Sequence, residues 1–196
     1  MAAHAWKAVL ALAISLTGGT AAGQTCPVGL GGLPAGWSEV PVTIRSTTPI
    51  LGAGRQLRCD GCTPQVTAII AAGPRPGAFP KTGLAWAQEG ATAPQARAQL
   101  LSGILSAVRA RSPECIVTGE LDGVSTTSAL AFITATTSLR CLPEQSEATQ
   151  LSYVAYDGRC LYDVVFAWKG PAALANHVRG RAHDLLNRLE PGSRSP

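Results

Sequence analysis

Apolar residues recur along this chain with a period of two in some stretches and close to four in others. Alternation over residues 37–45 predicts a half-buried β-strand. Apolar runs over residues 57–59 and 64–72 flank an Asp-Gly pair and predict the two arms of a hairpin. Residues 73–80 are rich in proline and glycine, which predicts a loop because proline lacks a backbone donor.

The second half of the chain predicts four more strands. Residues 115–121 precede an Asp122-Gly123 pair that predicts a turn, and a β-rich run follows over residues 126–142. Threonine and serine recur within this run. Their hydroxyl groups predict that one face of the strand is solvated.

The clearest hairpin signal joins residues 151–156 to residues 159–168 through Asp157-Gly158. A two-residue loop at this point fixes which residues face each other across the hairpin. The expected pairs are Ala155 with Cys160, Tyr153 with Tyr162, and Leu151 with Val164. Alternation then predicts that these six residues share one face with Phe166 and Trp168.

Helical periodicity occurs twice. Residues 93–110 follow a capping-box pattern, with Thr92 as the expected N-cap and Gln95 three residues later, and Ser112-Pro113 is expected to end the helix. Residues 171–189 predict a closing helix. Strands separated by these helices, without long βαβ crossovers, predict an α+β fold: a mostly antiparallel sheet packed against two main helices and stabilised by disulfides.

Residues 1–23 have the pattern of a secretory signal peptide. Lys7 precedes nine apolar residues (AVLALAISL), and small residues follow, with cleavage expected after Ala22 or Gly23. An apolar stretch of nine residues is too short to span a bilayer.

Removal of this segment is expected to leave one exported domain over residues 24–190 and a flexible tail over residues 191–196. No later stretch predicts a transmembrane segment. The expected location is therefore the periplasm or the outside of the cell.

Six cysteines lie in the expected mature chain, and an even number in an exported protein predicts disulfides. The close pair Cys59 and Cys62 also raises the hypothesis of thiol–disulfide exchange. A β-rich run follows this pair in place of a helix, which favours a structural disulfide around a two-residue turn. A third possibility is that each of the two bridges elsewhere. The disulfide or redox candidates are Cys26, Cys59, Cys62, Cys115, Cys141 and Cys160.

The composition of the 196 residues narrows the function classes. Only 14% of the residues are charged and 46% are apolar, which excludes disorder for most of the chain and allows one domain. The formal charge of +4 is scattered, so no nucleic-acid partner is expected. No metal site and no cofactor are expected, because zinc-type cysteine clusters are absent and Thr63 stands where a c-type heme needs histidine.

No catalytic residue is predicted. His177 and His183 lie six residues apart on the predicted closing helix and are expected at the surface, pointing apart. Glu114, Glu120 and Asp122 gather around one predicted hairpin, and they are the only basis for a hydrolase hypothesis.

Two tryptophans are the candidate binding residues. Trp86 lies in a predicted loop (TGLAWAQEG), where an exposed indole can recognise a ligand. Trp37 begins a predicted strand and is the second candidate, whereas Trp168 is expected in the core.

The C-terminal half resembles a known family. A strand reading TTSALAFITATTSLRCL, a hairpin reading LSYVAYDGRCLYDVVFAW and a final helix ending in LLNRL follow one another, and PVTIRS after Trp37 resembles an early strand. This order is similar to the end of PsbP-like α/β sandwich domains. The resemblance implies an exported accessory or binding protein that supports a larger complex, with no catalytic residues to transfer.

Together these patterns predict an exported, non-enzymatic accessory or binding protein. Its expected partner is a protein of the cell envelope, within an envelope or membrane-associated complex. The alternatives are a thiol–disulfide oxidoreductase that uses Cys59 and Cys62, or a small secreted hydrolase or inhibitor.

Overall fold

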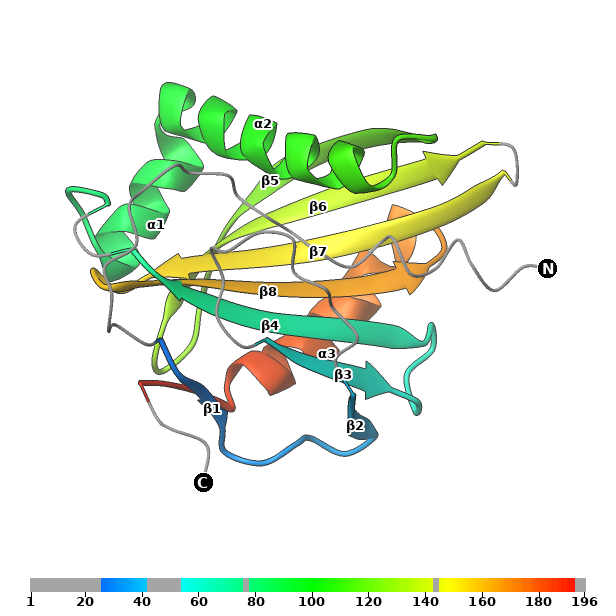
Figure 1. Ribbon diagram of the computed structural model, residues 1–196, viewed down its shortest axis with the longest axis horizontal. Helices are drawn as coiled ribbons and strands as arrows, with labels where there is room; N and C mark the ends of the chain where they lie inside the picture. The colour runs from blue at the N-terminus through cyan, green and yellow to red at the C-terminus, as the bar shows by residue number, and fades with distance from the viewer. Residues whose placement is uncertain (1–25, 42–53, 76–77, 143–144, 193–196) are drawn as a thin grey trace.

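The computed structural model describes residues 26–41, 54–75, 78–142 and 145–192. The predicted signal peptide and most of the predicted tail therefore lie outside the described residues, as does the second half of the strand predicted over 37–45. The described part contains a seven-stranded sheet and a two-stranded sheet, both antiparallel (Figure 1). A mostly antiparallel, disulfide-bonded α+β fold is confirmed.

The large sheet has the strand order β2-β3-β4-β8-β7-β6-β5, and the small sheet pairs β1 with β9. The strands are β1 (Val28–Leu30), β2 (Trp37–Val40), β3 (Arg55–Cys59), β4 (Val66–Pro74), β5 (Cys115–Thr126), β6 (Ala131–Cys141), β7 (Ser146–Tyr156), β8 (Cys160–Lys169) and β9 (Leu189–Pro191). The helices are α1 (Gly83–Thr92), α2 (Pro94–Arg111), the short 3-10 helix η2 (Ala172–Leu174) and α3 (Ala175–Leu186).

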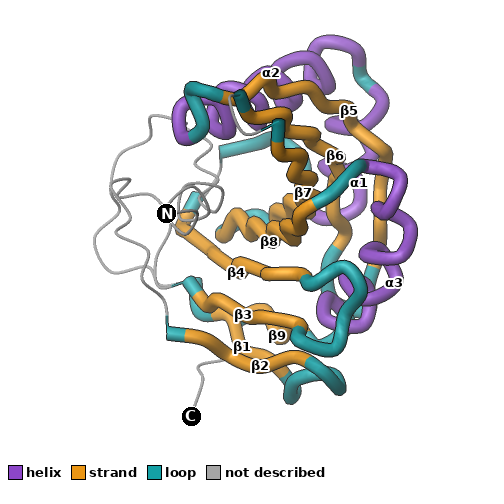
Figure 2. The backbone as a smooth tube through the Cα atoms, turned by 90° about the vertical axis from the view of Figure 1, so that its right-hand side faces the viewer, coloured by secondary structure: helices purple, strands orange, loops and turns teal. Residues whose placement is uncertain are grey.

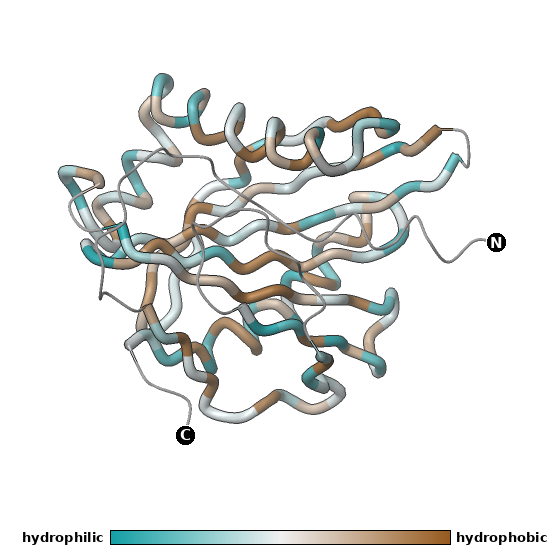
Figure 3. Tube along the Cα trace, in the orientation of Figure 1, coloured by the Kyte–Doolittle hydropathy of each residue, from teal (hydrophilic) through white to brown (hydrophobic). Residues whose placement is uncertain are grey.

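Helices cover both faces of the large sheet (Figure 2). We call the face that carries Val154 and Tyr156 the α2 face, because α1 and α2 pack on it. We call the face that carries Tyr153 and Ala155 the α3 face, because α3 and the small sheet pack on it. In Figure 3 the apolar colour runs along the central strands, between the helices that bury them.

The expectation of two main helices is wrong, because residues predicted as loop form α1. Its last residue, Thr92, donates its hydroxyl hydrogen to the Gln88 carbonyl at 2.7 Å instead of capping α2. Ala93 is the N-cap of α2, and Pro94 follows at the first helical position, where its missing N–H costs nothing. Ser112 ends α2 as the sequence predicts.

The predicted turn at Asp122-Gly123 is a β-bulge. Strand β5 runs through it without a break, with Leu121 opposite Ala135 and Gly123 opposite Thr134. Asp122 is therefore the extra residue. The positive φ of Gly123, 139°, explains why a turn-type residue pair occurs inside a strand.

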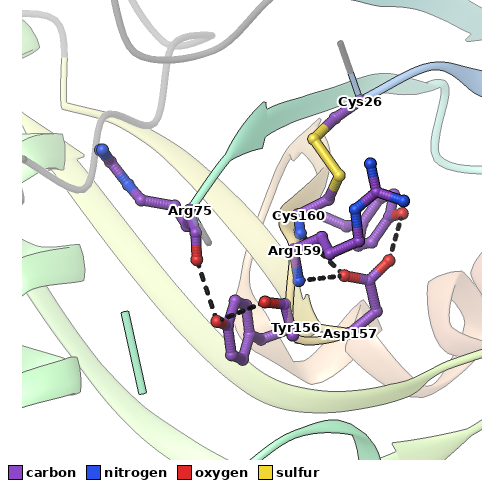
Figure 4. The surroundings of a disulfide bond; sticks show 8 residues. Cys26, Arg75, Tyr156, Asp157, Arg159 and Cys160 are labelled. Atoms are coloured by element: carbon purple, nitrogen blue, oxygen red, sulfur yellow. Dashed lines mark hydrogen bonds between the residues drawn. A yellow bond between two sulfur atoms is a disulfide. The ribbon is translucent and has the colours of Figure 1, made fainter. Parts of the chain in front are cut away.

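The β7–β8 hairpin exists, but its register differs by two residues from the expected one. Ala155 lies opposite Tyr162, and Tyr153 lies opposite Val164. The Asp157 carboxylate accepts hydrogen bonds from the backbone N–H groups of Arg159 (2.8 Å) and Cys160 (2.7 Å), which lengthens the loop (Figure 4). A shift of two preserves the faces, so the predicted apolar face is correct.

Three disulfides join the six cysteines: Cys26–Cys160, Cys59–Cys62 and Cys115–Cys141. The first ties the segment before β1 to the start of β8 (Figure 4). The predicted two-residue turn between Cys59 and Cys62 is wrong, because Cys59 pairs with Val66 across the sheet. Cys62 therefore lies inside a longer loop.

The chain after β8 departs from the predicted long helix. Residues 172–174 form a 3-10 turn, α3 ends at Leu186, and Leu189 begins β9. Leu189, the last residue of the predicted helix, is buried, but it packs from a strand. Antiparallel pairing of β9 with β1 extends regular structure into the predicted tail as far as Pro191.

Strand β5 is an edge of the large sheet, and two arginines of α2 cover part of that edge. The disulfide-linked residues at its start lie 4.0 Å apart between Cα atoms, the narrow spacing of a pair that exchanges no backbone hydrogen bonds. By alternation, Val117 and Leu121 direct their carbonyls away from β6. Arg109 donates to the Val117 carbonyl at 3.2 Å, and Arg97 donates to the Leu121 carbonyl at 2.7 Å.

Candidate functional site

The two tryptophans proposed as binding residues lie in the core. Trp86 is in α1, not in a loop, and is only 7% exposed. Its ring contacts those of Phe79 and Tyr156, with centroids 5.5 and 6.0 Å away. Trp37 is also 7% exposed and packs edge-on against Phe166. The expectation that Trp86 is exposed is therefore wrong, and the second candidate, Trp37, is buried as well.

The Cys59–Cys62 disulfide lies at the end of β3 and in the loop that follows. Cys59 is only 1% exposed, and a Cβ added at Gly36 would lie 3.8 Å from its sulfur. No helix begins at this pair, so no helix dipole acts on either sulfur. The surroundings are those of a structural bridge.

A cleft of about 740 Å³ opens on the α3 face, between α3 and strands β5, β6 and β7. It lies where α3 leaves the outer strands of the sheet uncovered. Its polar lining residues are Glu120, Asp122 and Ser125 from β5, Thr134 from β6, Tyr153 from β7, and Arg179 and His183 from α3. These side chains come from four elements that are distant in sequence.

Asp122 is held in the cleft by the β-bulge and by Arg179. The Asp122 carboxylate accepts a hydrogen bond from Arg179 Nη2 at 2.6 Å and from the Thr136 hydroxyl at 2.7 Å. The side chain of Asp122 is 17% exposed, so this ion pair is partly shielded from water. The buried Thr136 contradicts the expectation that the threonines of β6 form a solvated face.

Arginine side chains on both faces of the sheet hold the bulge by hydrogen bonds. Arg97 reaches the Leu121 carbonyl from the α2 face, and Arg179 reaches the next residue, Asp122, from the α3 face. Arg179 is itself oriented by Asn176, which accepts from its Nη1 at 3.0 Å. This part of the cleft wall is therefore fixed before any ligand arrives.

Tyr153 forms the floor of the cleft. The residue is 4% exposed, and its ring packs edge-on between Phe132 and Phe166. Among the described residues, its hydroxyl group has no hydrogen-bond partner. Burial raises the pKa of Tyr153 to about 12. The positive charge of Arg179 lowers this pKa, and the negative charge of Asp122 raises it further. The hydroxyl is therefore protonated and can donate or accept.

Glu120 and His183 complete the chemistry of the cleft. Both side chains are exposed, and neither side chain has an ion pair or hydrogen bond within the described part of the chain. The surface location expected for His183 and His177 is confirmed. Glu114 does not join them, because it precedes the start of β5 and lies six residues before Glu120 along an extended strand.

The residues that make this cleft were missed in part by reasoning from the sequence. The sequence predicts Glu120 and Asp122 as carboxylates near one hairpin, but it gives no signal for Arg179 and predicts Tyr153 only as part of an apolar face. Arg179 contacts a residue 57 positions earlier in the chain, and no local pattern reports such a contact. The Asp-Gly pair followed by a long β-rich run was the available signal, since it also fits a bulge.

Within the described ranges, no group of three or more His, Cys, Asp or Glu residues could hold a metal ion. Likewise, none of the helices in the described part is both long and apolar enough to cross a membrane.

No family model and no curated protein matches the sequence. Among solved structures, a protein from Bacteroides thetaiotaomicron VPI-5482 has a TM-score of 0.45 and 10% identity, covering 82% of this chain and 44% of its own. This chain thus spans less than half the length of that protein. LpqN, involved in cell envelope biogenesis of Mycobacterium tuberculosis, has a TM-score of 0.43 and 8% identity, covering 85% of this chain and 84% of its own. Neither likeness is strong enough to carry an argument about function.

Proposed function

We propose that the protein is an exported, non-enzymatic binding protein of the cell envelope, and that the cleft on its α3 face holds a small ligand. The observation that carries this proposal is the hydroxyl group of Tyr153, which belongs to an otherwise buried side chain, lines the cleft and has no hydrogen-bond partner in the described residues. A ligand in the cleft can form a hydrogen bond with it, which contributes about 0.5–1.5 kcal/mol.

Two further features support a preformed site. The Asp122–Arg179 pair is fixed by Thr136, Asn176 and the bulge, so it loses little conformational entropy on binding. The volume of about 740 Å³ lies within the range of ordinary small-molecule sites.

Export is supported by the signal-like pattern of residues 1–23 and by the three disulfides. Disulfides persist in oxidising compartments and are rare in the cytosol of mesophiles. The envelope partner and the resemblance to PsbP-like domains stay predictions.

The cleft is tested by filling it. Gly180 lines the cleft on α3, and a Cβ at this position meets no atom within 4 Å, so Gly180→Trp adds bulk there without a clash near the backbone. Gly103 on α2 has the same open surroundings, which makes Gly103→Trp the matched control.

The purified disulfide-bonded protein is labelled with ¹⁵N and mixed with the dialysable fraction of a bacterial periplasmic extract. We expect amide shift changes at β5, β7 and α3 that persist in Gly103→Trp and vanish in Gly180→Trp. Shift changes that survive in Gly180→Trp, or none in the wild type, would refute the cleft as the binding site.

The export half of the proposal has its own test. Residues 1–26 are fused to a reporter enzyme that needs disulfides for activity. We expect activity from this fusion and its loss when Leu12→Asp interrupts the apolar stretch. Equal activity of the two fusions contradicts export through this segment.

A hydrolase is the second candidate, because Glu120 and His183 are unpartnered titratable groups in one cleft. The two functions differ in turnover. A ligand recovered unchanged after incubation with the protein supports binding, whereas a product that forms in the wild type and not in Glu120→Gln supports hydrolysis.

A further inference from the structure

We infer that the cleft selects a small polyhydroxylated ligand that carries a positively charged amino group. The inference rests on the proposed function and deepens it by naming the ligand class. It follows from how the charges in the cleft are already used and from which groups are left over.

With His183 counted as neutral, the charge of the lining is negative by one. Glu120 and Asp122 contribute two negative charges, and Arg179 contributes one positive charge. The charges of Asp122 and Arg179, whose side chains are in contact at 2.6 Å, neutralise each other. The carboxylate of Glu120 is then the uncompensated charge of the cleft, and it attracts a cation.

An anion is disfavoured at the same place. Arg179 is the group that would bind it, but its Nη2 donates to both Asp122 and Thr136, and its Nη1 donates to Asn176. An anionic ligand would have to displace the Asp122 carboxylate from Arg179 or lie next to that carboxylate. Both arrangements oppose binding.

The remaining polar groups are suited to hydroxyls. Tyr153 presents its unpartnered hydroxyl at the floor, and Ser125 and Thr134 present theirs on the neighbouring strands. Thr134 already donates to the Gly123 carbonyl at 3.2 Å, so its oxygen is left to accept a hydrogen bond. Each of these groups can pair with a ligand hydroxyl, which both donates and accepts.

Three probes with the same six-carbon polyol chain isolate the effect of charge. Glucamine ends in an ammonium group, sorbitol in a neutral alcohol, and gluconate in a carboxylate. Each is titrated into the ¹⁵N-labelled disulfide-bonded protein at neutral pH and low ionic strength, and its Kd is taken from amides of β5, β7 and α3. We expect glucamine to bind about two- to fivefold more tightly than sorbitol, with gluconate weakest.

Two variants assign the effect to residues. Glu120→Gln should abolish the difference between the Kd of glucamine and the Kd of sorbitol measured in the same variant. Tyr153→Phe should weaken all three probes alike, by about three- to tenfold, since it removes a hydroxyl contact but no charge. Glu147→Gln removes an exposed carboxylate at the opposite end of β7 and is the charge-matched control.

Sorbitol or gluconate binding as tightly as glucamine would overturn the inference, and so would a glucamine preference that survives Glu120→Gln. Absence of binding by all three probes would overturn it too. The proposed function is judged separately, because the loss of extract-induced shifts in Gly180→Trp does not depend on the ligand class.

Discussion

The two faces of the large sheet are covered to different extents, and the difference produces the cleft. On the α2 face, helices α1 and α2 contribute 10 and 18 residues, which pack against β5, β6 and β7. On the α3 face, α3 has only 12 residues, and the small sheet accompanies it. The α3 face therefore leaves part of the outer strands uncovered, and polar side chains occupy that part.

Glycines show the same difference on a smaller scale. Gly90 of α1 lies directly against Ile133, so a Cβ at this position would collide with the end of the isoleucine side chain. Gly180 of α3 faces open space beside the cleft. Close packing defines the α2 face, whereas the α3 face combines a packed half with an accessible half.

The largest difference in stability between the two faces is expected from their disulfides. Cys26–Cys160 closes a separation of 134 residues on the α3 face, and Cys115–Cys141 closes 26 residues on the α2 face. Chain entropy predicts a loss of about 5 kcal/mol of stability on replacing the first pair by serines and about 3.5 kcal/mol for the second. Urea unfolding of both double variants measures the two losses, and an equal loss would show that loop length does not decide them.

The second-largest effect on stability is expected from the two arginines that hydrogen-bond to the bulge. Arg97→Met and Arg179→Met should each lower the free energy of unfolding by about 1–2 kcal/mol, because each leaves an oxygen of β5 without a charged donor. A double-mutant cycle should show coupling of about 0.5–1 kcal/mol, since both hold adjacent residues. Arg181→Met, on the exposed side of α3, is the control. Strict additivity would mean that the two faces hold the bulge independently.

The two helix glycines should respond with opposite signs. Gly90→Ala is expected to destabilise the protein by about 1–2 kcal/mol through overpacking against Ile133. Gly180→Ala is expected to stabilise it by about 0.5–1 kcal/mol, because alanine favours the helix and nothing obstructs its Cβ. Gly103→Ala, on an open part of α2, should behave like Gly180→Ala. Thermal unfolding of the three variants gives the signs.

The smallest expected effect is the loss of stability at low pH when Asp157 is protonated. Burial alone would raise the pKa of Asp157, but hydrogen bonds from the backbone of Cys160 and Arg159 and from the Tyr162 hydroxyl lower it below its ordinary value. The stabilisation by this carboxylate is therefore present above the pKa of the unfolded chain, about 3.9, and is lost as the pH falls through the lower folded-state pKa.

Two tyrosines at this hairpin lie on opposite faces of the sheet and allow the contribution of Asp157 to be tested. Tyr162→Phe, on the α3 face, should cost about 1 kcal/mol at neutral pH and progressively less in acid, because its partner is a carboxylate. Tyr156→Phe, on the α2 face, removes the hydroxyl whose single hydrogen is shared between the backbone carbonyls of Arg75 and Gly158, each 2.9 Å away, and should cost a similar amount at every pH. Parallel pH profiles of the two variants would argue against this role for Asp157.

Local patterns in the sequence predict most of the sheet but not its details. Alternation and the Asp157-Gly158 signal locate β7 and β8 and their faces, yet the register depends on the Asp157 side chain, which bonds to the loop backbone. Helix α1 was missed because two glycines and a following proline resemble a loop, although the proline begins α2. Burial of Trp86 follows from that helix.

The cleft could be predicted only in part, because it depends on contacts between distant segments. The carboxylates of Glu120 and Asp122 are visible as a local pair. The placement of Arg179 opposite them requires the position of α3 on the sheet, and the buried position of Tyr153 requires the packing of Phe132 and Phe166 around it. Neither is encoded in a short window of sequence.

A free sheet edge of twelve residues is a template on which a second copy of the chain can add a strand. At β5, two of the outward carbonyls already accept hydrogen bonds from guanidinium groups, which a neutral backbone amide replaces at a loss. Arg97 and Arg109 therefore oppose self-assembly at this edge. In other sheets a very short edge strand has the same effect. Because the two arginines protect the edge, β5 keeps the length that carries Glu120 and Asp122 to the cleft.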